Sequence, residues 1–285
     1  MRRLRIADAS DAAGWVVSGV LAAVAGARRG KAVHPHGAVH RATLRVPGAP
    51  AAPREARLFS ERGEHDAIVR FSRSVGLPRP LPDLLGMSIR VVDAYGTGRH
   101  QDLLLVTSVD LPVLHHVFVP AGDVQDRIYS SSLPFRAGEE RFLVGALPRG
   151  GSPRPDGRDE LDRLRRAAET GELRFDLAVA RLQGRFQPVA ELHVGERLGP
   201  ALDALRFNPF NCGGGMRPSG VLNRWRATAY PLSQAAWRRT ERDGAERQDA
   251  ADAQLRALDR GAGDLGSAPL VRGGVRAPAR SRRHR

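Results

Sequence analysis

A histidine-rich segment near the amino terminus is the first part of the sequence that could do chemistry. It reads His34-Pro35-His36-Gly37, with His40 three residues further on. Side chains alternate between the two faces of an extended strand, so His34, His36 and His40 would share one face. Three imidazoles on one face can bind zinc or another transition metal. The same residues also suit a solvent-exposed turn, and the sequence leaves both interpretations open.

Two further residues extend the metal interpretation. His65 and Asp66 follow in the next segment, and with the first cluster they could form a metal-dependent hydrolase acting on a phosphodiester or a similar anion. The nucleotide-binding and hydrolase motifs with a known local pattern are absent from the sequence: the Walker loop, the Rossmann fingerprint, G-x-S-x-G and H-E-x-x-H. Cys212, the single cysteine, excludes an internal disulfide framework and a cysteine-cluster metal site.

The order of short motifs along the chain is similar to that of the haem catalases. Lys31-Ala-Val-His34-Pro-His-Gly37 resembles the catalase segment with a basic residue, the distal histidine and a glycine, and Val69-Arg70-Phe71-Ser72 resembles the second signature of that family. Leu85–Val91 and Gln101-Asp102-Leu103 are similar to the barrel strands that follow. The resemblance covers about residues 30–120 well and 174–238 more loosely.

A second part of the resemblance lies late in the chain. Catalases ligate iron through a tyrosine four residues after an arginine, and Arg226-Ala-Thr-Ala-Tyr230 has that spacing. Residues four apart lie one above the other on a helix. A guanidinium there can hold a phenol deprotonated despite a reference pKa near 10, and a phenolate donates electron density to ferric iron.

The resemblance implies a fold and a set of roles. The fold is an antiparallel catalase-type β-barrel with peripheral helices, of the α+β class, with haem b bound inside. Tyr230 would be the proximal ligand, stabilised by Arg226, and His34 the distal acid–base group. The remaining contacts would come from Lys31 and Arg70, which would pair with the haem propionates, and from Ser72, which would orient His34.

Departures from the family pattern indicate a minimal member of the superfamily. Leu104-Leu105-Val106-Thr107 stands where catalases place a distal asparagine, and the chain is far shorter than a full catalase. We therefore predict weak catalase activity and a peroxidase reaction with hydrogen peroxide or a small organic hydroperoxide. The departures leave a second function open, a haem-free barrel of this fold that serves in binding.

Net charge and amino-acid composition limit the classes of binding partner that we expect. The 285 residues carry a formal net charge of +14, yet Lys31 is the only lysine, which indicates a compositional bias rather than a phosphate-binding surface. Only 5% of residues are aromatic, so a base-stacking platform is not expected. The apolar run Gly14–Ala27 is shorter than the roughly 20 residues of a membrane-spanning helix. We expect a cytoplasmic protein without a transmembrane segment or a specific nucleic-acid partner, and homo-oligomerisation is left open.

Hydrophobic spacing predicts the elements that would position these residues. An amphipathic helix is expected within residues 1–30, a barrel domain over 31–240 and a disordered arginine-rich tail over 241–285. Within the barrel domain, helices are predicted at Glu160–Thr170 and Leu222–Arg239. Strands are predicted at Ala38–Val46, Met87–Asp93, Asp102–Thr107, Arg174–Leu182 and Val189–Val194, and Ala67–Phe71 is a short apolar stretch.

Overall fold

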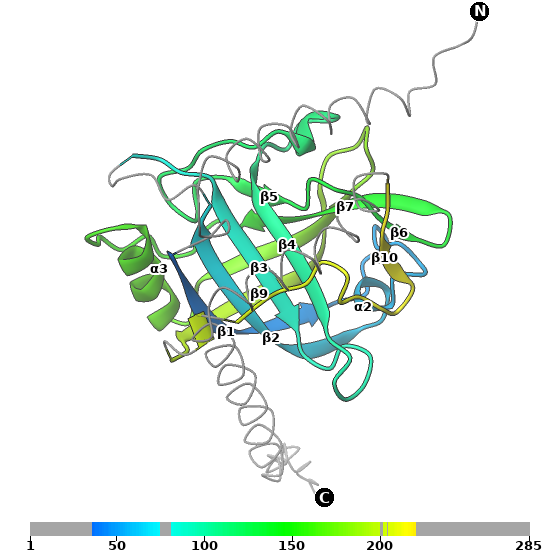
Figure 1. Ribbon diagram of the computed structural model, residues 1–285, viewed down its shortest axis with the longest axis horizontal. Helices are drawn as coiled ribbons and strands as arrows, with labels where there is room; N and C mark the ends of the chain where they lie inside the picture. Colours follow the sequence, from blue (N-terminus) through cyan, green and yellow to red (C-terminus); the bar gives the residue numbers. More distant parts are fainter. Residues whose placement is uncertain (1–35, 75–80, 200–201, 204, 221–285) are drawn as a thin grey trace, which may run out of the picture.

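The computed structural model describes residues 36–74, 81–199, 202–203 and 205–220 (Figure 1). Most of the regular structure in these residues is strand, and the strands are joined by loops and by a few short helices. In chain order the elements are β1 (His36–Val46), α2 (Arg57–Ser60), β2 (Gly63–Arg73), β3 (Leu85–Val91), β4 (Gln101–Ser108), η1 (Leu114–His116), β5 (Ile128–Ser130), β6 (Phe135–Ala137), β7 (Glu140–Pro148), α3 (Glu160–Glu169), β8 (Arg174–Ala180), β9 (Gln187–Arg197) and β10 (Met216–Pro218).

The strands form a closed antiparallel barrel. Eight of them follow the order β7-β5-β4-β3-β2-β1-β9-β8, and pairing of β7 with β8 closes the ring. β6 pairs with the first half of β7, and β10 pairs with β6, so these two short strands extend the sheet beside the ring. A closed ring satisfies the backbone hydrogen-bonding groups of every strand on both sides.

Strand alternation determines which side chains fill the barrel. In β1 the even-numbered Ala42, Leu44 and Val46 join the main core, and in β2 the odd-numbered Ala67, Val69 and Phe71 do so. Rings and long aliphatic chains from the other strands complete this interior, among them Met87, Ile89, Leu103, Leu105, Tyr129, Phe175 and Leu177. A barrel of eight strands is just wide enough for side chains to fill. Apolar side chains occupy the described interior, so a group as large as haem b would need another face of the barrel, and the expectation that one is bound stays a prediction.

A second apolar cluster lies on the outer wall. Val39 and Ile68, which alternate with the interior residues of β1 and β2, pack with Leu198, Leu202, Leu205 and Phe207. The last four belong to the segment after β9, which crosses the outside of the barrel (Figure 1). We call residues 202–203 and 205–213 of this segment the strap. The outer wall of β1 to β4 is thus partly covered by the chain itself.

A buried ion pair holds the strap in place. Arg90 of β3 donates from Nε and Nη2 to the two carboxylate oxygens of Asp102 in β4, each at 2.8 Å. Arg90 Nη2 also donates to the carbonyl oxygen of Arg206, and the guanidinium lies 5.3 Å from the ring centroid of Phe207. Asp102 accepts the backbone N–H of Asn208 at 2.8 Å. Each charge is therefore bound both to its partner and to the strap.

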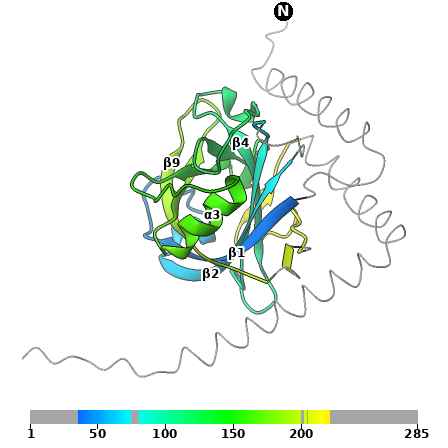
Figure 2. The ribbon, with the colours of Figure 1, turned by 90° about the vertical axis from the view of Figure 1, so that its left-hand side faces the viewer.

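Helix α3 lies against the barrel near β9 and β1 (Figure 2). Its buried face, Leu164, Ala167 and Ala168, joins the interior core. Asp159 caps the helix by accepting the backbone N–H groups of Leu161 and Asp162, as a helix N-cap does.

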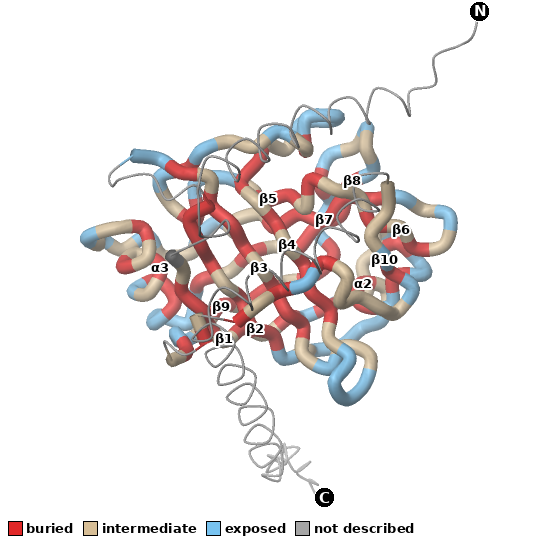
Figure 3. The backbone as a smooth tube through the Cα atoms, viewed as in Figure 1, coloured by how far each residue is buried: buried red, intermediate tan, exposed pale blue. Residues whose placement is uncertain are grey.

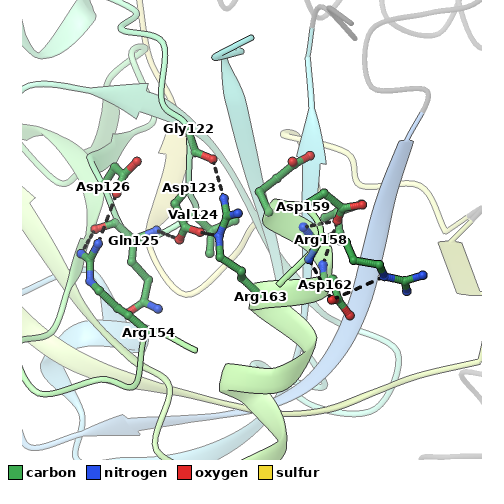
Figure 4. Close-up of polar contacts among 12 residues, drawn as sticks. Gly122, Asp123, Val124, Gln125, Asp126, Arg154, Arg158, Asp159, Asp162 and Arg163 are labelled. Atoms are coloured by element: carbon green, nitrogen blue, oxygen red, sulfur yellow. Dashed lines mark hydrogen bonds and ion pairs between the residues drawn. The ribbon is translucent and has the colours of Figure 1, made fainter. Parts of the chain in front are cut away.

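Two arginines connect α3 and the loop before it to the connection between β4 and β5 (Figure 4). Arg163 donates to Asp123 at 2.6 Å and to the carbonyl oxygen of Gly122 at 3.0 Å. Arg154 donates to Asp126 and to the carbonyl oxygen of Gln125. The helix is thereby fixed by apolar packing on one side and by charge-assisted hydrogen bonds on the other.

Most strands predicted from the sequence are confirmed. β1, β3, β4, β8 and β9 and helix α3 lie at the predicted places, and β3 and β4 form the predicted antiparallel hairpin. β2 contains the apolar stretch at Ala67–Phe71, for which the sequence analysis named no strand. β5, β6, β7 and β10 have no counterpart in the prediction. The helices expected at 14–27 and 222–239 and the tail from 241 lie outside the described residues, and the part described supports a barrel without confirming the α+β class. Among the described residues no helix is long and apolar enough to cross a membrane.

The ion pair of Arg90 and Asp102 gives a testable consequence for stability. Replacement Asp102→Asn removes one charge and leaves the buried guanidinium without its counter-ion, so we expect a loss of about 3–5 kcal/mol in the free energy of unfolding. Glu61→Gln is the matched control, because its ion pair with Arg57 is exposed and screened by water, so its loss should change the free energy of unfolding little. Urea unfolding measures both, and equal losses would contradict the importance of the pair.

Candidate functional site

Arg70 and Ser72 lie together on the outer wall of the barrel. Both alternate with the interior residues Val69 and Phe71 of β2, so their side chains point away from the main core. In the antiparallel register Arg70 is opposite Val39 and Ser72 is opposite Gly37. The described residues of the two motifs, about 35 residues apart in sequence, are therefore neighbours on one face.

Gly37, the last residue of the motif Lys31–Gly37, is required on this face for a steric reason. A Cβ atom at Gly37 would lie 2.8 Å from the guanidinium carbon of Arg70 and 2.6 Å from the carbonyl oxygen of Phe71. Real Cβ contacts of that length essentially never occur, so only glycine lets the Arg70 side chain pass over β1 here. The pair Gly37 and Arg70 thus directs a guanidinium toward the beginning of β1.

Asp203 of the strap lies close to this guanidinium. Its carboxylate accepts the backbone N–H of Val39 at 3.2 Å and a hydrogen bond from Arg197 at 2.9 Å. Burial lowers the pKa of the Arg70 guanidinium, and the negative charge of Asp203 opposes that shift. The strap therefore supplies a negative charge beside a cation that is largely removed from water.

The rest of this wall is small or aliphatic. Across β2, β3 and β4 the register places Ser72 beside Gly86 and Val106, and Arg70 beside Ser88 and Leu104. Leu104 packs against the outer apolar cluster. We call the face formed by Gly37, Val39, Arg70, Ser72, Gly86, Ser88, Leu104 and Val106 the outer-wall site. It combines one partly buried cation, Arg70, with surrounding side chains that are small and mostly apolar.

His40 belongs to the other face of β1. Its side chain is fully buried, its Nδ1 lies 3.0 Å from the carbonyl oxygen of Gly195, and its ring meets Phe71 edge-on. Burial lowers its pKa, as does the charge of Arg197, while the bond to Gly195 and the charge of Asp203 raise it. Desolvation dominates, so the ring is a neutral part of the interior.

The described members of the proposed hydrolase cluster do not come together. His65 is opposite Leu44, four residues along β1 from His40, which corresponds to about 13 Å along the strand. Asp66 follows His65 in the same strand and so points to the other face. In the part of the chain that the structure describes, no group of three or more His, Cys, Asp or Glu residues could hold a metal ion.

The glycine run after Cys212 serves packing. The Tyr95 ring lies directly over Gly213 and Gly214, where a Cβ atom would come within 2.7 and 2.1 Å of ring carbons. The Tyr95 hydroxyl donates to Gln101 at 2.9 Å, and Arg57 donates its backbone N–H to the carbonyl oxygen of Gly214. Burial raises the pKa of the Cys212 thiol, which disfavours the nucleophilic thiolate.

The remaining predicted site residues are not placed. Lys31, His34, Arg226 and Tyr230 all lie outside the described residues, so their roles stay predictions. His36 is the first residue of β1, and it is placed by its backbone opposite Arg73.

Comparisons with known proteins give a coarse likeness. No family model matches the chain, and no curated protein matches it. Among solved structures, a bacterial catalase aligns at 13% identity and a TM-score of 0.46, covering 71% of this chain and 57% of the catalase. A fungal catalase aligns at 11% identity and a TM-score of 0.49, covering 70% of this chain. The chain spans 57% and 58% of the lengths of these two catalases.

Sequence reasoning missed two contributors to the outer-wall site. Asp203 is 164 residues away from Val39, which it binds, and no local motif marks it. Ser88 lies within a predicted strand, and nothing in the sequence marks it as a site residue. Its place beside Arg70 depends on the register of β2 with β3. The glycine at 37 was identified as part of a motif, but its contact with Arg70 required the register of β1 with β2.

The buried ring of His40 predicts how stability depends on pH. Burial lowers the folded-state pKa below its ordinary value of 6.5, so on acidification the unfolded chain takes up a proton before the folded chain does. The free energy of unfolding should therefore fall as the pH drops below about 6.5, and be unaffected by this group above it.

The variant His40→Asn keeps an N–H donor and does not titrate, so its stability should fall less steeply in the same range. Urea unfolding at about pH 7.5, 6.5 and 5.5 measures the free energy of unfolding of both proteins. Losses that come from other titrating groups are the same in the two proteins and cancel in the comparison. Parallel curves for the two proteins would show that His40 is not the group responsible.

Proposed function

We propose that this protein binds haem b on the outer wall of its barrel and acts as a peroxidase toward hydroperoxides. The observation that carries the proposal is the pairing of the two sequence motifs: Gly37 opens a path for the Arg70 guanidinium, and Ser72 lies in the same register row. These two motifs resemble haem catalases in sequence, and the barrel brings their described residues to one face.

The described residues fit such a group. A haem presents an apolar ring and two carboxylates, and the outer-wall site presents small and aliphatic side chains around one partly buried cation. A Cβ at Gly37 would fill the path that Arg70 takes. Arg70 and Lys31 would pair with the propionates, and Tyr230, stabilised by Arg226, would ligate the iron. Lys31, Arg226 and Tyr230 enter the proposal from the sequence alone.

The chain's own residues would handle the proton. The iron of a bound haem supplies the redox chemistry that breaks the O–O bond. His34 takes a proton from the near oxygen of the hydroperoxide and returns it to the far oxygen, which makes the far oxygen a better leaving group. Ser72 orients the imidazole for that transfer. Because His34 both accepts and gives the proton, it must be neutral when the substrate arrives.

The aliphatic wall favours organic hydroperoxides over hydrogen peroxide. Leu104 and Val106 lie on the face of β4 that carries the site, where catalases are expected to have an asparagine. Aliphatic side chains cannot orient a small polar peroxide by hydrogen bonding, but they can contact the hydrocarbon part of an organic one. The wall therefore supports a peroxidase with weak catalase activity.

The first test is the absorption spectrum of the full chain purified from haem-supplemented cells. We expect a stoichiometric Soret band that shifts or disappears in Tyr230→Phe, and that weakens in Gly37→Ala, because the added Cβ displaces Arg70. Tyr129→Phe is the matched control, since this buried tyrosine lies in the barrel interior and donates to the carbonyl oxygen of Val124. His34→Ala should keep the band and lose peroxidase activity.

A missing Soret band, even after added hemin, would overturn the proposal and leave a haem-free binding barrel as the function to test. A band that is equally changed by Tyr129→Phe would show a general loss of structure rather than loss of the ligand.

Substrate preference gives a second prediction. The wild-type protein should turn over a tertiary alkyl hydroperoxide faster than it dismutates hydrogen peroxide. Leu104→Asn or Val106→Asn should raise dismutation by about fivefold, the rate equivalent of one net hydrogen bond of about 1 kcal/mol. Oxygen release and alkyl hydroperoxide consumption, measured side by side, check the ratio. Dismutation as fast as in true catalases would contradict an aliphatic distal wall.

A further inference from the structure

His116 and Ser132 meet beside β5, and the proposed function uses neither of them. His116 ends η1 in the connection between β4 and β5, and Ser132 is the second residue after β5. The Nδ1 atom of His116 is hydrogen-bonded to the carbonyl oxygen of Ser132, so the ring and the serine are in contact. Residues 111–114 before them are exposed, whereas the end of β5 is buried (Figure 3). The pair therefore lies at a boundary between surface and interior.

The hydrogen bond of His116 determines which ring nitrogen carries the proton. A backbone carbonyl oxygen can only accept, so Nδ1 must be the donor. In a neutral ring Nε2 then keeps its lone pair and can only accept a hydrogen bond. The Nε2 atom is buried, and among the described residues it has no donor. A buried acceptor without a donor costs free energy, which a bound donor group would recover.

The hydroxyl of Ser132 is a second buried polar group of this kind. The residue is 7% exposed, and its Oγ atom has no hydrogen-bond partner in the described part of the chain. Its φ of 56° lies in the left-handed region, which residues other than glycine seldom adopt. Ser130 Oγ accepts the backbone N–H of Ser132 at 3.1 Å and helps to hold the backbone there. The Ser132 side chain is therefore placed by its backbone and not by a bond of its own.

Two other described histidines differ from His116 in this respect. The ring nitrogens of His115 lie 3.2 and 2.8 Å from two backbone carbonyl oxygens, so both are occupied. His40 also has a buried Nε2 atom without a partner, but its ring is fully buried against Phe71 inside the barrel. At His116 the unpartnered acceptor is accompanied by an unpartnered hydroxyl, on the residue to which the ring is bonded.

The two groups require a ligand that both donates and accepts. A hydroxyl meets this requirement, because its O–H donates to Nε2 of His116 and its oxygen accepts from the Ser132 hydroxyl. A carboxylate cannot donate and an ammonium group cannot accept, so each would leave one of the two atoms without a partner. Ser130 is opposite Val106 of the outer-wall site in the register of β4 with β5, so the pair lies next to that site.

We propose that His116 and Ser132 bind the hydroxyl group of a small neutral alcohol or alkyl hydroperoxide. Both compounds carry the same O–H group, and a hydroperoxide yields the corresponding alcohol when its O–O bond is broken. Neither contact involves haem. Hydroxyl binding and a missing Soret band can therefore be observed together, and each result bears on one proposal alone.

Nuclear magnetic resonance of the full chain labelled with nitrogen-15 tests the binding. The probes are tert-butanol, tert-butyl hydroperoxide and methyl tert-butyl ether, which has the same hydrocarbon group but no O–H. At mildly alkaline pH, where histidine rings are neutral, we expect both hydroxyl compounds to shift the Nε2 resonance of His116 in a saturable way. The ether should leave it unchanged, since it has no hydrogen to donate.

Two variants separate the contacts. His116→Asn keeps an N–H donor for the carbonyl oxygen of Ser132 but has no Nε2 acceptor, and Ser132→Ala removes the hydroxyl. Each should weaken binding of tert-butanol about fivefold, the equivalent of one net hydrogen bond of about 1 kcal/mol. The backbone amide resonance of Leu133 reports binding in all the proteins. His193→Asn is the matched control, because its ring lies on β9 beside Glu191, and it should bind as the wild type does.

Three outcomes would overturn the proposal. The first is the absence of a saturable shift in the wild type, including an Nε2 resonance that is already hydrogen-bonded without ligand and does not move, which would assign the place to an ordered water. The second is a shift as large with the ether as with tert-butanol. The third is unchanged affinity in both His116→Asn and Ser132→Ala, with circular dichroism showing all variants folded.

Discussion

The ion pair between Arg90 and Asp102 is the interaction on which the outer face of this barrel depends. It joins β3 to β4 and also binds the strap through Arg206 and Asn208. The strap in turn brings Asp203 to Val39 and covers the outer apolar cluster. Two buried opposite charges would be costly alone, and here each has its partner and further hydrogen bonds, which is the condition under which buried charges are tolerated. Loss of this pair would release the strap and change the surroundings of Arg70.

The packed interior determines where chemistry can take place. An eight-stranded barrel filled by its own side chains offers a ligand only its ends and its outside. On the outside, the alternation of each strand decides which side chains face outward, so Arg70 and Ser72 of β2 lie on the outer face while Val69 and Phe71 support the wall from within. The site is built on strands held in register by neighbours on both sides, a rigid base for groups that must be placed accurately.

The sequence predicted the strands well where one face is buried and turns are marked by glycine or proline. The resemblance to catalases implied one site for the Gly37 and Arg70 motifs, and the register of β1 with β2 places their described residues side by side, while their roles stay predictions. The sequence could not predict whether Arg70 and Ser72 face the interior or the outside of the barrel. The alternation of side chains along β2 separates two faces but does not show which of them faces the interior. β5, β6 and β10 have only three residues each, too few for a pattern. Asp203 could not be found, since its contact with Val39 spans 164 residues.

The closure of the ring has a consequence for how the chain folds during synthesis. β1, β2, β3 and β4 pair with their neighbours in sequence and can form soon after they leave the ribosome. The second partner of β1 is β9, and His40 is 155 residues from Gly195, to which it bonds. At 5–20 residues per second this separation takes about 8 to 30 s to synthesise. Throughout that time β1 is an open edge, the kind that pairs with other chains, so the nascent barrel is most exposed to aggregation before β9 arrives.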